Sequence, residues 1–152
     1  MYLPLHTTAR TPLIVKTLNN VAVEYFELGL KDLSYQILDT LYHDVSDCIE
    51  NCGDLLPVIS CNMGNMLRQS GYYEEAYRIC RQGLTDCFKT GFLYAVPELI
   101  LQLSILCQYM GNPAQAESFY FLGSVLFQWS RHKTVPYTLY ELMEQDFLLY
   151  YE

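Results

Sequence analysis

Residues 70–76 read Ser70-Gly71-Tyr72-Tyr73-Glu74-Glu75-Ala76, and two other segments of the chain repeat their pattern. The matching segments are Leu28-Gly29-Leu30-Lys31-Asp32-Leu33-Ser34 and Met110-Gly111-Asn112-Pro113-Ala114-Gln115-Ala116. Each of them places a small residue five positions after its glycine. A fixed period of this kind is typical of repeat architectures. The glycines lie 42 and 40 residues apart and therefore predict three copies of one structural unit.

Apolar and small residues before each glycine are spaced at i, i+3, i+4 and i+7, which places them on one face of an α-helix. The sets are Leu18, Val21, Ala22, Tyr25; Ser60, Met63, Gly64, Leu67; and Ile100, Leu103, Ser104, Cys107. Their third members are small, and we expect these to face the small residues of a second helix, Ser34, Ala76 and Ala116. Facing small residues let two helices cross closely. We expect Leu38, Cys80 and Tyr120 to fill the space further along, so each unit is predicted to be a helical hairpin.

Glycine and proline mark the predicted helix ends. Gly29, Gly71 and Gly111 are expected to end the first helices in the left-handed conformation, and Gly53 and Gly91 to end second helices. Helices are expected to start at cap-plus-proline pairs such as Asn112-Pro113, and with Pro57 and Pro97 at a first position. Asp54 is a candidate N-cap. The predicted helices are 12–28, 31–51, 55–70, 73–90, 94–110, 113–131 and 136–151.

The segment Gly64-Asn65 followed by Gly71-Tyr72-Tyr73-Glu74-Glu75-Ala76 resembles the central signature of the tetratricopeptide repeat (TPR). The resemblance covers most of residues 12–131 and is strongest in the second repeat. The spacing exceeds the 34 residues of the ordinary repeat. Long repeats of this kind are similar to the C-terminal sensor regions of bacterial helix-turn-helix regulators, including the peptide-sensing group. Residues 1–11 are too short for a helix-turn-helix, so the resemblance implies part of a longer regulator or a free-standing repeat protein.

The resemblance implies an all-α fold, a right-handed α-solenoid of about three TPR-like hairpins. The expected organisation is a tail or linker at 1–11, one domain at 12–152 with repeats near 12–53, 54–91 and 94–131, and a capping helix at 136–151. The outer face of that last helix is an alternative interface with another subunit. Its candidate residues are Phe147, Leu148, Tyr150 and Tyr151.

Composition and charge exclude several classes of protein. Apolar residues make up 51% of the 152 residues, which is typical of a folded domain. The net charge of −8, with only nine scattered lysines and arginines, argues against direct nucleic-acid binding. The apolar stretches are too short to span a membrane. The six cysteines without a secretory leader indicate the cytoplasm, where buried cysteines act as small hydrophobic residues.

In the resembled family, ligands lie on the first helix of each hairpin, on the side away from its partner helix. By register this face carries Lys16, Asn19, Val23, Phe26 and Glu27; Val58, Cys61, Asn65, Arg68 and Gln69; and Glu98, Leu101, Ile105, Gln108 and Tyr109, with Asn20, Asn62 and Gln102 beside it. Amide side chains both donate and accept hydrogen bonds and so suit a peptide backbone. Arginine can hold a carboxylate through two hydrogen bonds. The binding set we predict is Asn19, Asn62, Asn65, Arg68, Gln69, Gln102, Gln108 and Tyr109, and the alternative is that these are ordinary solvated surface residues.

Catalytic and metal sites find little support in the sequence. His43, Asp44, Asp47, Cys48 and Cys52 are close together but lack the paired spacing of a zinc site. No nucleophile motif or phosphate-binding glycine loop is present. The sequence therefore predicts a protein that is not an enzyme and has no cofactor. Its expected partner is a peptide or protein, with homodimerisation, either as the ligand-sensing region of a bacterial transcriptional regulator or as a free-standing adaptor.

Overall fold

The computed structural model describes residues 12–47 and 53–132, and these residues form α-helices and short 3-10 helices without a strand. The α-helices are α1 (Pro12–Glu27), α2 (Lys31–Asp47), α4 (Leu56–Gln69), α5 (Tyr73–Thr90), α6 (Val96–Tyr109) and α7 (Pro113–His132). The 3-10 helices are η1 (Gly53–Leu55) and η2 (Leu93–Ala95). The predicted helices are confirmed to within two residues wherever both ends are described. The predicted tail at 1–11, the end of the second helix at 48–51 and the capping helix at 136–151 lie outside the described residues.

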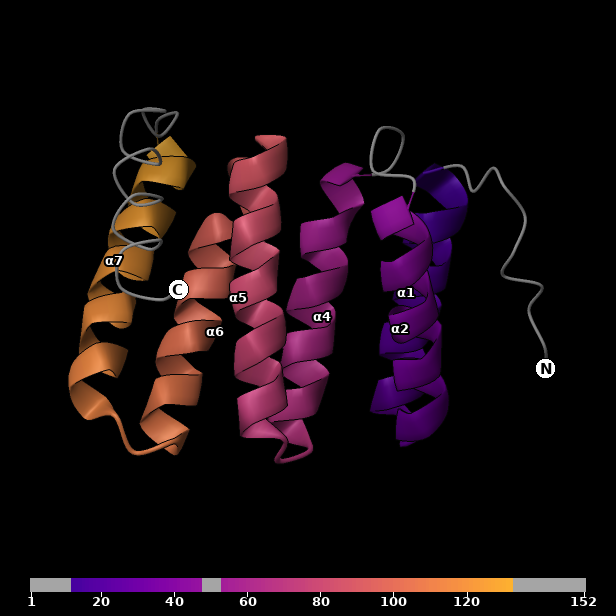
Figure 1. Ribbon diagram of the computed structural model, residues 1–152, viewed down its shortest axis with the longest axis horizontal. Helices are drawn as coiled ribbons and strands as arrows, with labels where there is room; N and C mark the ends of the chain where they lie inside the picture. The colour runs from indigo at the N-terminus through magenta and orange to yellow at the C-terminus, as the bar shows by residue number, and fades with distance from the viewer. Residues whose placement is uncertain (1–11, 48–52, 133–152) are drawn as a thin grey trace.

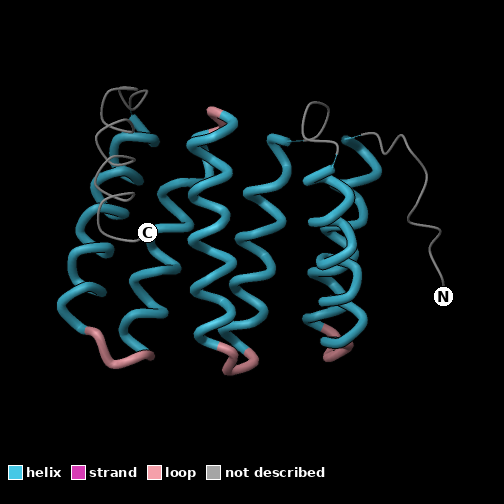
Figure 2. The backbone as a smooth tube through the Cα atoms, viewed as in Figure 1, coloured by secondary structure: helices cyan, strands magenta, loops and turns pink. Residues whose placement is uncertain are grey.

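The six α-helices pack neighbour to neighbour in chain order. Helices α1 and α2, α4 and α5, and α6 and α7 pack as pairs, while α4 packs on α2 and α6 packs on α5 (Figure 1). The turns inside the three pairs lie at one edge of the molecule, and the turn between α5 and η2 lies at the opposite edge (Figure 2). The described chain is thus a row of three antiparallel helical hairpins.

Left-handed glycines end four of the helices as predicted, whereas Gly53, expected to end a second helix, is the first residue of η1. The φ angles of Gly29, Gly71 and Gly111 are 85°, 85° and 79°, and Gly91 after α5 has φ 78°. In each pair, the residue after the glycine donates its N–H to the carbonyl five residues earlier, as Tyr72 does to Leu67 at 2.9 Å. This backbone conformation is easily accessible only to glycine, so the turn glycines fix where each hairpin reverses.

The predicted pairs of small residues meet inside each hairpin. Ser34 Oγ donates a hydrogen bond to the carbonyl oxygen of Ala22 at 2.5 Å. Ser104 Oγ donates to the carbonyl oxygen of Ala116 at 2.6 Å, so here the serine lies on the first helix instead. Gly64 lies close to Ala76, whose carbonyl oxygen would be 3.8 Å from a Cβ added at the glycine. Close helix crossing is therefore confirmed in all three hairpins.

The prediction for Tyr120 is wrong. Leu38 and Cys80 are fully buried as expected, but Tyr120 is 64% exposed and Phe119 is buried in its place. In the first two hairpins, the second helix is covered by the first helix of the next hairpin: α4 packs against α2, and α6 packs against α5. Among the described residues no following helix packs on α7 in the same way, so no described helix covers the face that carries Tyr120.

The starts of α4 and α6 differ from the prediction. Each is preceded by a 3-10 turn, and Pro57 and Pro97 take the second helical position, one residue later than expected. Asp54 lies inside η1 and is not the N-cap of α4, because that position belongs to Leu55, which makes no side-chain cap hydrogen bond. Asn112 is confirmed as a cap, since its Oδ1 accepts the backbone N–H of Gln115 at 3.3 Å.

Candidate functional site

The first helices α1, α4 and α6 carry the face on which the sequence places a ligand. The structure divides the predicted positions into three classes. Asn19, Phe26 and Cys61 are buried; Val23, Val58, Asn65, Arg68 and Leu101 are half-buried; Lys16, Glu27, Gln69, Glu98, Ile105, Gln108 and Tyr109 are exposed. Four of the five predicted positions on α6 are exposed, against two on α1 and one on α4, so α6 presents most of the accessible surface.

Two predicted amides connect successive first helices. Asn62 Nδ2 donates to Asn19 Oδ1 at 3.0 Å, which joins α4 to α1. Gln102 Nε2 donates to the carbonyl oxygen of Cys61 at 3.1 Å, which joins α6 to α4. Each donor lies two residues before the small residue of its helix, and each acceptor lies three residues before the small residue of the preceding first helix. We call these two contacts the amide latches.

The amide latches occupy three of the predicted binding residues. Gln102 Oε1 also accepts a hydrogen bond from Cys80 Sγ at 3.3 Å, so both the oxygen and the nitrogen of this buried amide have a partner. Asn19 is 7% exposed and Gln102 is 8% exposed. Buried polar groups need hydrogen-bond partners, and here the neighbouring hairpin supplies them. Asn19, Asn62 and Gln102 therefore hold the hairpins in register.

The first latch gives a stability prediction. Replacing Asn62 with alanine removes the donor to buried Asn19, and we expect the free energy of unfolding to fall by about 1 kcal/mol. Replacing the exposed neighbour Asn20 with alanine should change it by less than about 0.5 kcal/mol. Urea denaturation followed by circular dichroism measures both variants. Equal effects of the two substitutions would show that the latch contributes nothing specific.

Arg68 and Asn65 form the polar centre of the face that remains. Arg68 Nη2 donates to Asn65 Oδ1 at 2.5 Å. Within the described part of the chain, the Nε of Arg68 is buried without a hydrogen-bond partner. An unsatisfied buried donor on a charged group is costly. The contact with Asn65 orients the guanidinium of this half-buried residue.

Two clefts lie along the same face. The first, of about 430 Å³, is lined by residues of α1, η1, α4 and η2, among them Lys16, Asn19, Val58 and Tyr94. The second, of about 620 Å³, lies between α6 and α7, and its lining includes Ile105, Gln108, Tyr109 and Tyr120. Since Asn65 and Arg68 belong to α4, the helix between α1 and α6, the face combines a polar centre with a cleft toward each end.

Sequence reasoning missed two tyrosines that line these clefts. Tyr94 donates its hydroxyl to the carbonyl oxygen of Asp54, which ties η2 to η1. Tyr120 lines the cleft between α6 and α7. Neither has a local sequence signal, since Tyr94 falls at the start of a predicted helix and Tyr120 occupies a position that is buried in the other two hairpins.

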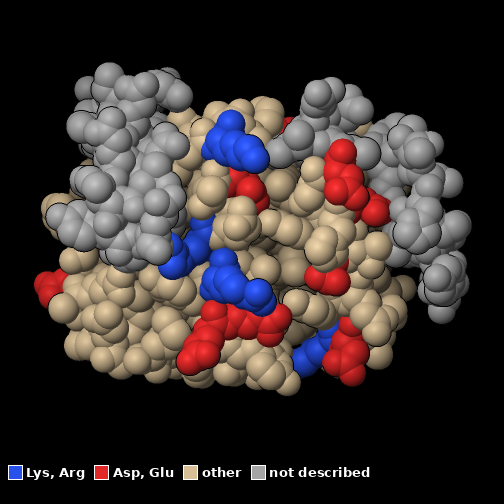
Figure 3. Space-filling view, viewed as in Figure 1, with Lys and Arg blue, Asp and Glu red and all other residues tan. Residues whose placement is uncertain are grey.

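Charge is unevenly distributed over the described helices. Among the residues whose side chains are described, the lysines and arginines are Lys16, Lys31, Arg68, Arg78, Arg81 and Lys89, and three of these, Arg78, Arg81 and Lys89, lie in α5. On the face shown in Figure 3, basic side chains gather mainly over the middle, where Figure 1 places α5. Among the predicted positions of the first helices, the basic residues are Lys16 on α1 and Arg68 on α4.

Cys61, Cys80, Cys87 and Cys107 are free thiols in the core. Burial raises the pKa of Cys80 and of Cys87 to about 12, so both are protonated at neutral pH. A thiolate is the form that attacks substrates and binds metals. Within residues 12–47 and 53–132, no group of three or more histidine, cysteine or acidic side chains could hold a metal ion. These four cysteines behave as packing residues, as the sequence predicted.

No protein-family model matches the chain, and no curated protein matches it significantly. None of the described helices is both long enough and apolar enough to cross a bilayer. The predicted C-terminal interface residues Phe147, Leu148, Tyr150 and Tyr151 lie outside the described residues. The function proposed below is therefore argued from the contacts of α1, α4 and α6.

Proposed function

We propose that this chain binds a peptide or protein segment along the face of α1, α4 and α6, in a TPR-like right-handed array. The observation that carries the proposal is the state of Arg68. Its guanidinium is oriented by Asn65, and its Nε is buried without a partner in the described structure. A carboxylate or a backbone carbonyl of a bound segment would supply acceptors to this group, and charge-assisted hydrogen bonds are the strong ones.

The surroundings of Arg68 support a chain-like ligand. Gln69 and Gln108 are exposed on the same face, and amide side chains pair with both N–H and C=O groups of an extended peptide. The clefts at the two ends offer space for side chains of the segment, with Val58 at one and Ile105 at the other. A ligand that uses the centre and both clefts would contact all three hairpins.

Given this ligand class and the repeat resemblance, we assign the chain to the ligand-sensing and dimerisation region of a bacterial transcriptional regulator. The second candidate is a free-standing adaptor that assembles proteins. It is favoured by the outer surface of α7, where Tyr120 and Phe121 are 64% and 71% exposed. Exposed aromatic residues are enriched at protein interfaces.

A peptide library screened against the whole chain tests the groove. Peptides selected from a library of random dodecamers should bind Arg68→Ala at least about tenfold more weakly, because hydrogen bonds to a charged group are lost. The matched control is Lys89→Ala, an exposed basic residue of α5, which should bind as the unmodified chain does. Isothermal titration calorimetry measures the affinities.

Two results would contradict the groove. Unchanged affinity of the selected peptides for Arg68→Ala and Gln108→Ala would place the ligand elsewhere. If Phe121→Ser abolishes that binding at the same time, the adaptor function through α7 is favoured instead.

A further inference from the structure

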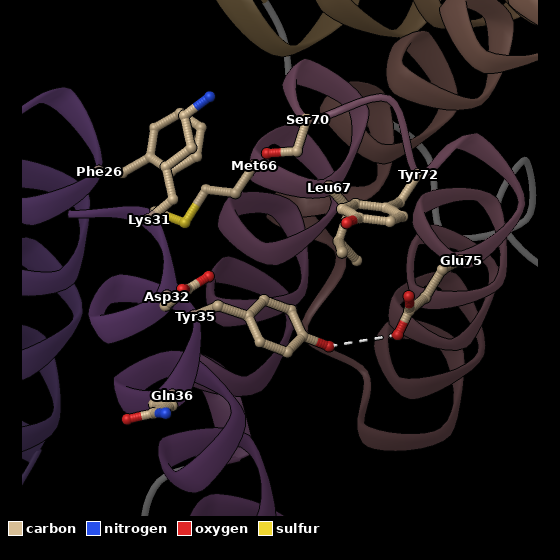
Figure 4. Close-up of a pocket in the computed structure, with 10 residues that line it drawn as sticks. All are labelled: Phe26, Lys31, Asp32, Tyr35, Gln36, Met66, Leu67, Ser70, Tyr72 and Glu75. Atoms are coloured by element: carbon tan, nitrogen blue, oxygen red, sulfur yellow. Dashed lines mark hydrogen bonds between the residues drawn. The ribbon is translucent and has the colours of Figure 1, made fainter. Parts of the chain in front are cut away.

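A separate cleft lies between the first and second hairpins, at the edge that carries the hairpin turns. Its volume is about 380 Å³. Phe26, Met66 and Leu67 supply its apolar surface, and Tyr35 and Tyr72 are also part of its lining. Figure 4 shows the Tyr35 ring reaching from α2 toward Glu75 on α5, and its hydroxyl donates to Glu75 Oε1 at 3.4 Å. The cleft thus combines aromatic rings with a carboxylate at one end.

At the equivalent junction between the second and third hairpins, two tyrosine rings stack on each other. Tyr73 and Tyr109 stack with centroids 4.8 Å apart and planes 7° from parallel. Tyr73 lies two residues after a turn glycine and Tyr109 lies two residues before the next one. At the first junction these positions hold Lys31 and Gln69, which cannot stack as two rings do. The junction between the first and second hairpins therefore lacks the stacked aromatic pair of the next junction.

A second difference concerns the tyrosine that lies six residues after the turn glycine in the first and second hairpins. In the second hairpin this residue is Tyr77, and the guanidinium of Arg81 lies 5.9 Å from its ring centroid. In the first hairpin it is Tyr35, and the residue in the place of Arg81 is Asp39. The charges of Glu75 and Asp39 add to burial in raising the pKa of Tyr35. Arg78, which pairs with Glu75, opposes part of that rise. The first hairpin therefore has the ring beside two carboxylates, but no arginine at the position equivalent to Arg81.

We propose that this cleft binds an arginine side chain of a partner protein. A guanidinium is planar, stacks on aromatic rings and pairs with carboxylates through a fork of donors. The partner's guanidinium would lie beside the ring of Tyr35, as the guanidinium of Arg81 lies beside the ring of Tyr77. Its apolar stem would lie on Met66 and Leu67, and its head would reach Glu75.

The charges at the cleft fit a cationic guest. Asp32 and Glu75 are both part of the lining, and the chain as a whole has a net charge of −8. Lys31 is the lysine of the lining, and its Nζ lies 5.4 Å from the centroid of the Phe26 ring. Figure 4 places that amine beside Phe26, on the rim opposite Glu75. Arg78 approaches Glu75 at 3.7 Å, but this pair is exposed and therefore weak.

The test uses three acetylated and amidated tripeptides, with arginine, lysine or citrulline between two glycines. Citrulline has the shape of arginine without its charge. In two-dimensional NMR spectra of the whole chain, the arginine peptide should shift the signals of residues around Tyr35 and Glu75 in a saturable way. The lysine peptide should bind about two- to fivefold more weakly, since it cannot stack, and the citrulline peptide should not shift these signals.

Two variants localise the effect. Glu75→Gln should weaken the arginine peptide about two- to fivefold. Lys31→Tyr combined with Gln69→Tyr installs the pair of the second junction and should abolish the shifts, while leaving the helical circular dichroism spectrum intact. Equal shifts with the citrulline peptide, or shifts that persist in the doubly substituted chain, would overturn the proposal. Shifts confined to the surroundings of Arg68 would overturn it as well, and would leave the groove of the first helices standing.

Discussion

Replacing Gly64 with alanine is expected to lower the free energy of unfolding by about 1–3 kcal/mol, the usual cost of an overpacked core. The added methyl group would lie 2.5 Å from Cys80 Sγ and 3.0 Å from Gln102 Oε1. Both neighbours are buried, and the thiol and the amide also contact each other. In an open helix the same substitution would gain about 1 kcal/mol of helix propensity. The sign of the effect therefore tells whether the crossing of α4 and α5 is as close as described.

A double-mutant cycle identifies the clash as the cause. Cys80→Ala alone should cost about 1 kcal/mol, because it leaves a small void. Combined with Gly64→Ala it removes the sulfur that the new methyl group meets, so the pair should be more stable than the sum of the single effects predicts. Guanidinium denaturation of the four proteins measures the coupling. Strict additivity, or a stabilising Gly64→Ala, would show that the two helices have room to spare.

Features of the fold that depend on local sequence could be predicted well. The turn glycines could be identified from the sequence because glycine is the residue type with easy access to the left-handed conformation. The pairs Ala22 with Ser34 and Ser104 with Ala116 follow from helical spacing within one hairpin, where the turn fixes the register of the two helices. Only short segments of chain have to be considered in each case.

The roles of individual side chains on the first-helix face could not be predicted in the same way. Asn19 and Asn62 meet across 43 positions of sequence, and their contact depends on how two hairpins slide against each other. An amide that pairs with a neighbouring hairpin has the same sequence pattern as one that awaits a peptide. Tyr120 illustrates the converse, because it occupies a core position of the repeat but lacks a described helix to cover it.

The junction cleft and the amide latches have a common origin. Each hairpin repeats the same backbone plan, so a difference between equivalent residues becomes a local difference in surface. Tyr73 and Tyr109 stack at one junction, whereas the equivalent residues at the other are Lys31 and Gln69, and a cleft lined in part by Lys31 lies there.

The second hairpin also holds a buried carboxylate that couples it to the first. Asp86 on α5 is 7% exposed, and its Oδ2 accepts a hydrogen bond from the Tyr42 hydroxyl of α2 at 3.2 Å. Gln82 Nε2 donates to its Oδ1 at 3.1 Å. Burial raises the pKa of Asp86 above 3.8, and the two hydrogen bonds and the charge of Lys89 oppose part of that rise.

The raised pKa fixes the sign of the pH dependence. Folded Asp86 binds its proton more tightly than unfolded Asp86 does, so its contribution to the free energy of unfolding falls as the pH rises from 3.8 through the folded-state pKa. Above that value the charged carboxylate depends on Tyr42 and Gln82 for its hydrogen bonds.

Replacing Tyr42 with phenylalanine is therefore expected to cost about 1.5–3 kcal/mol at pH 7, as for a lost hydrogen bond to a charged group. The loss should shrink as the pH falls toward 4, since Asp86 then takes up a proton and no longer needs the donor as strongly. Urea denaturation at a series of pH values measures both chains. Urea is the suitable denaturant because it adds no salt that would screen the charges.

The matched background is Asp86→Asn, which removes the titrating group and keeps its size. In that background the cost of Tyr42→Phe should be smaller and independent of pH between 4 and 7. If the cost of Tyr42→Phe still depends on pH in the Asp86→Asn background, the dependence belongs to other carboxylates of the chain. If that cost is constant with pH in the unmodified background, Asp86 does not titrate in this range. If the expected pattern is found, the contact between α2 and α5 is held by a charge that acid removes, and the amide latches of the first helices, which do not titrate, carry the register of the hairpins at every pH.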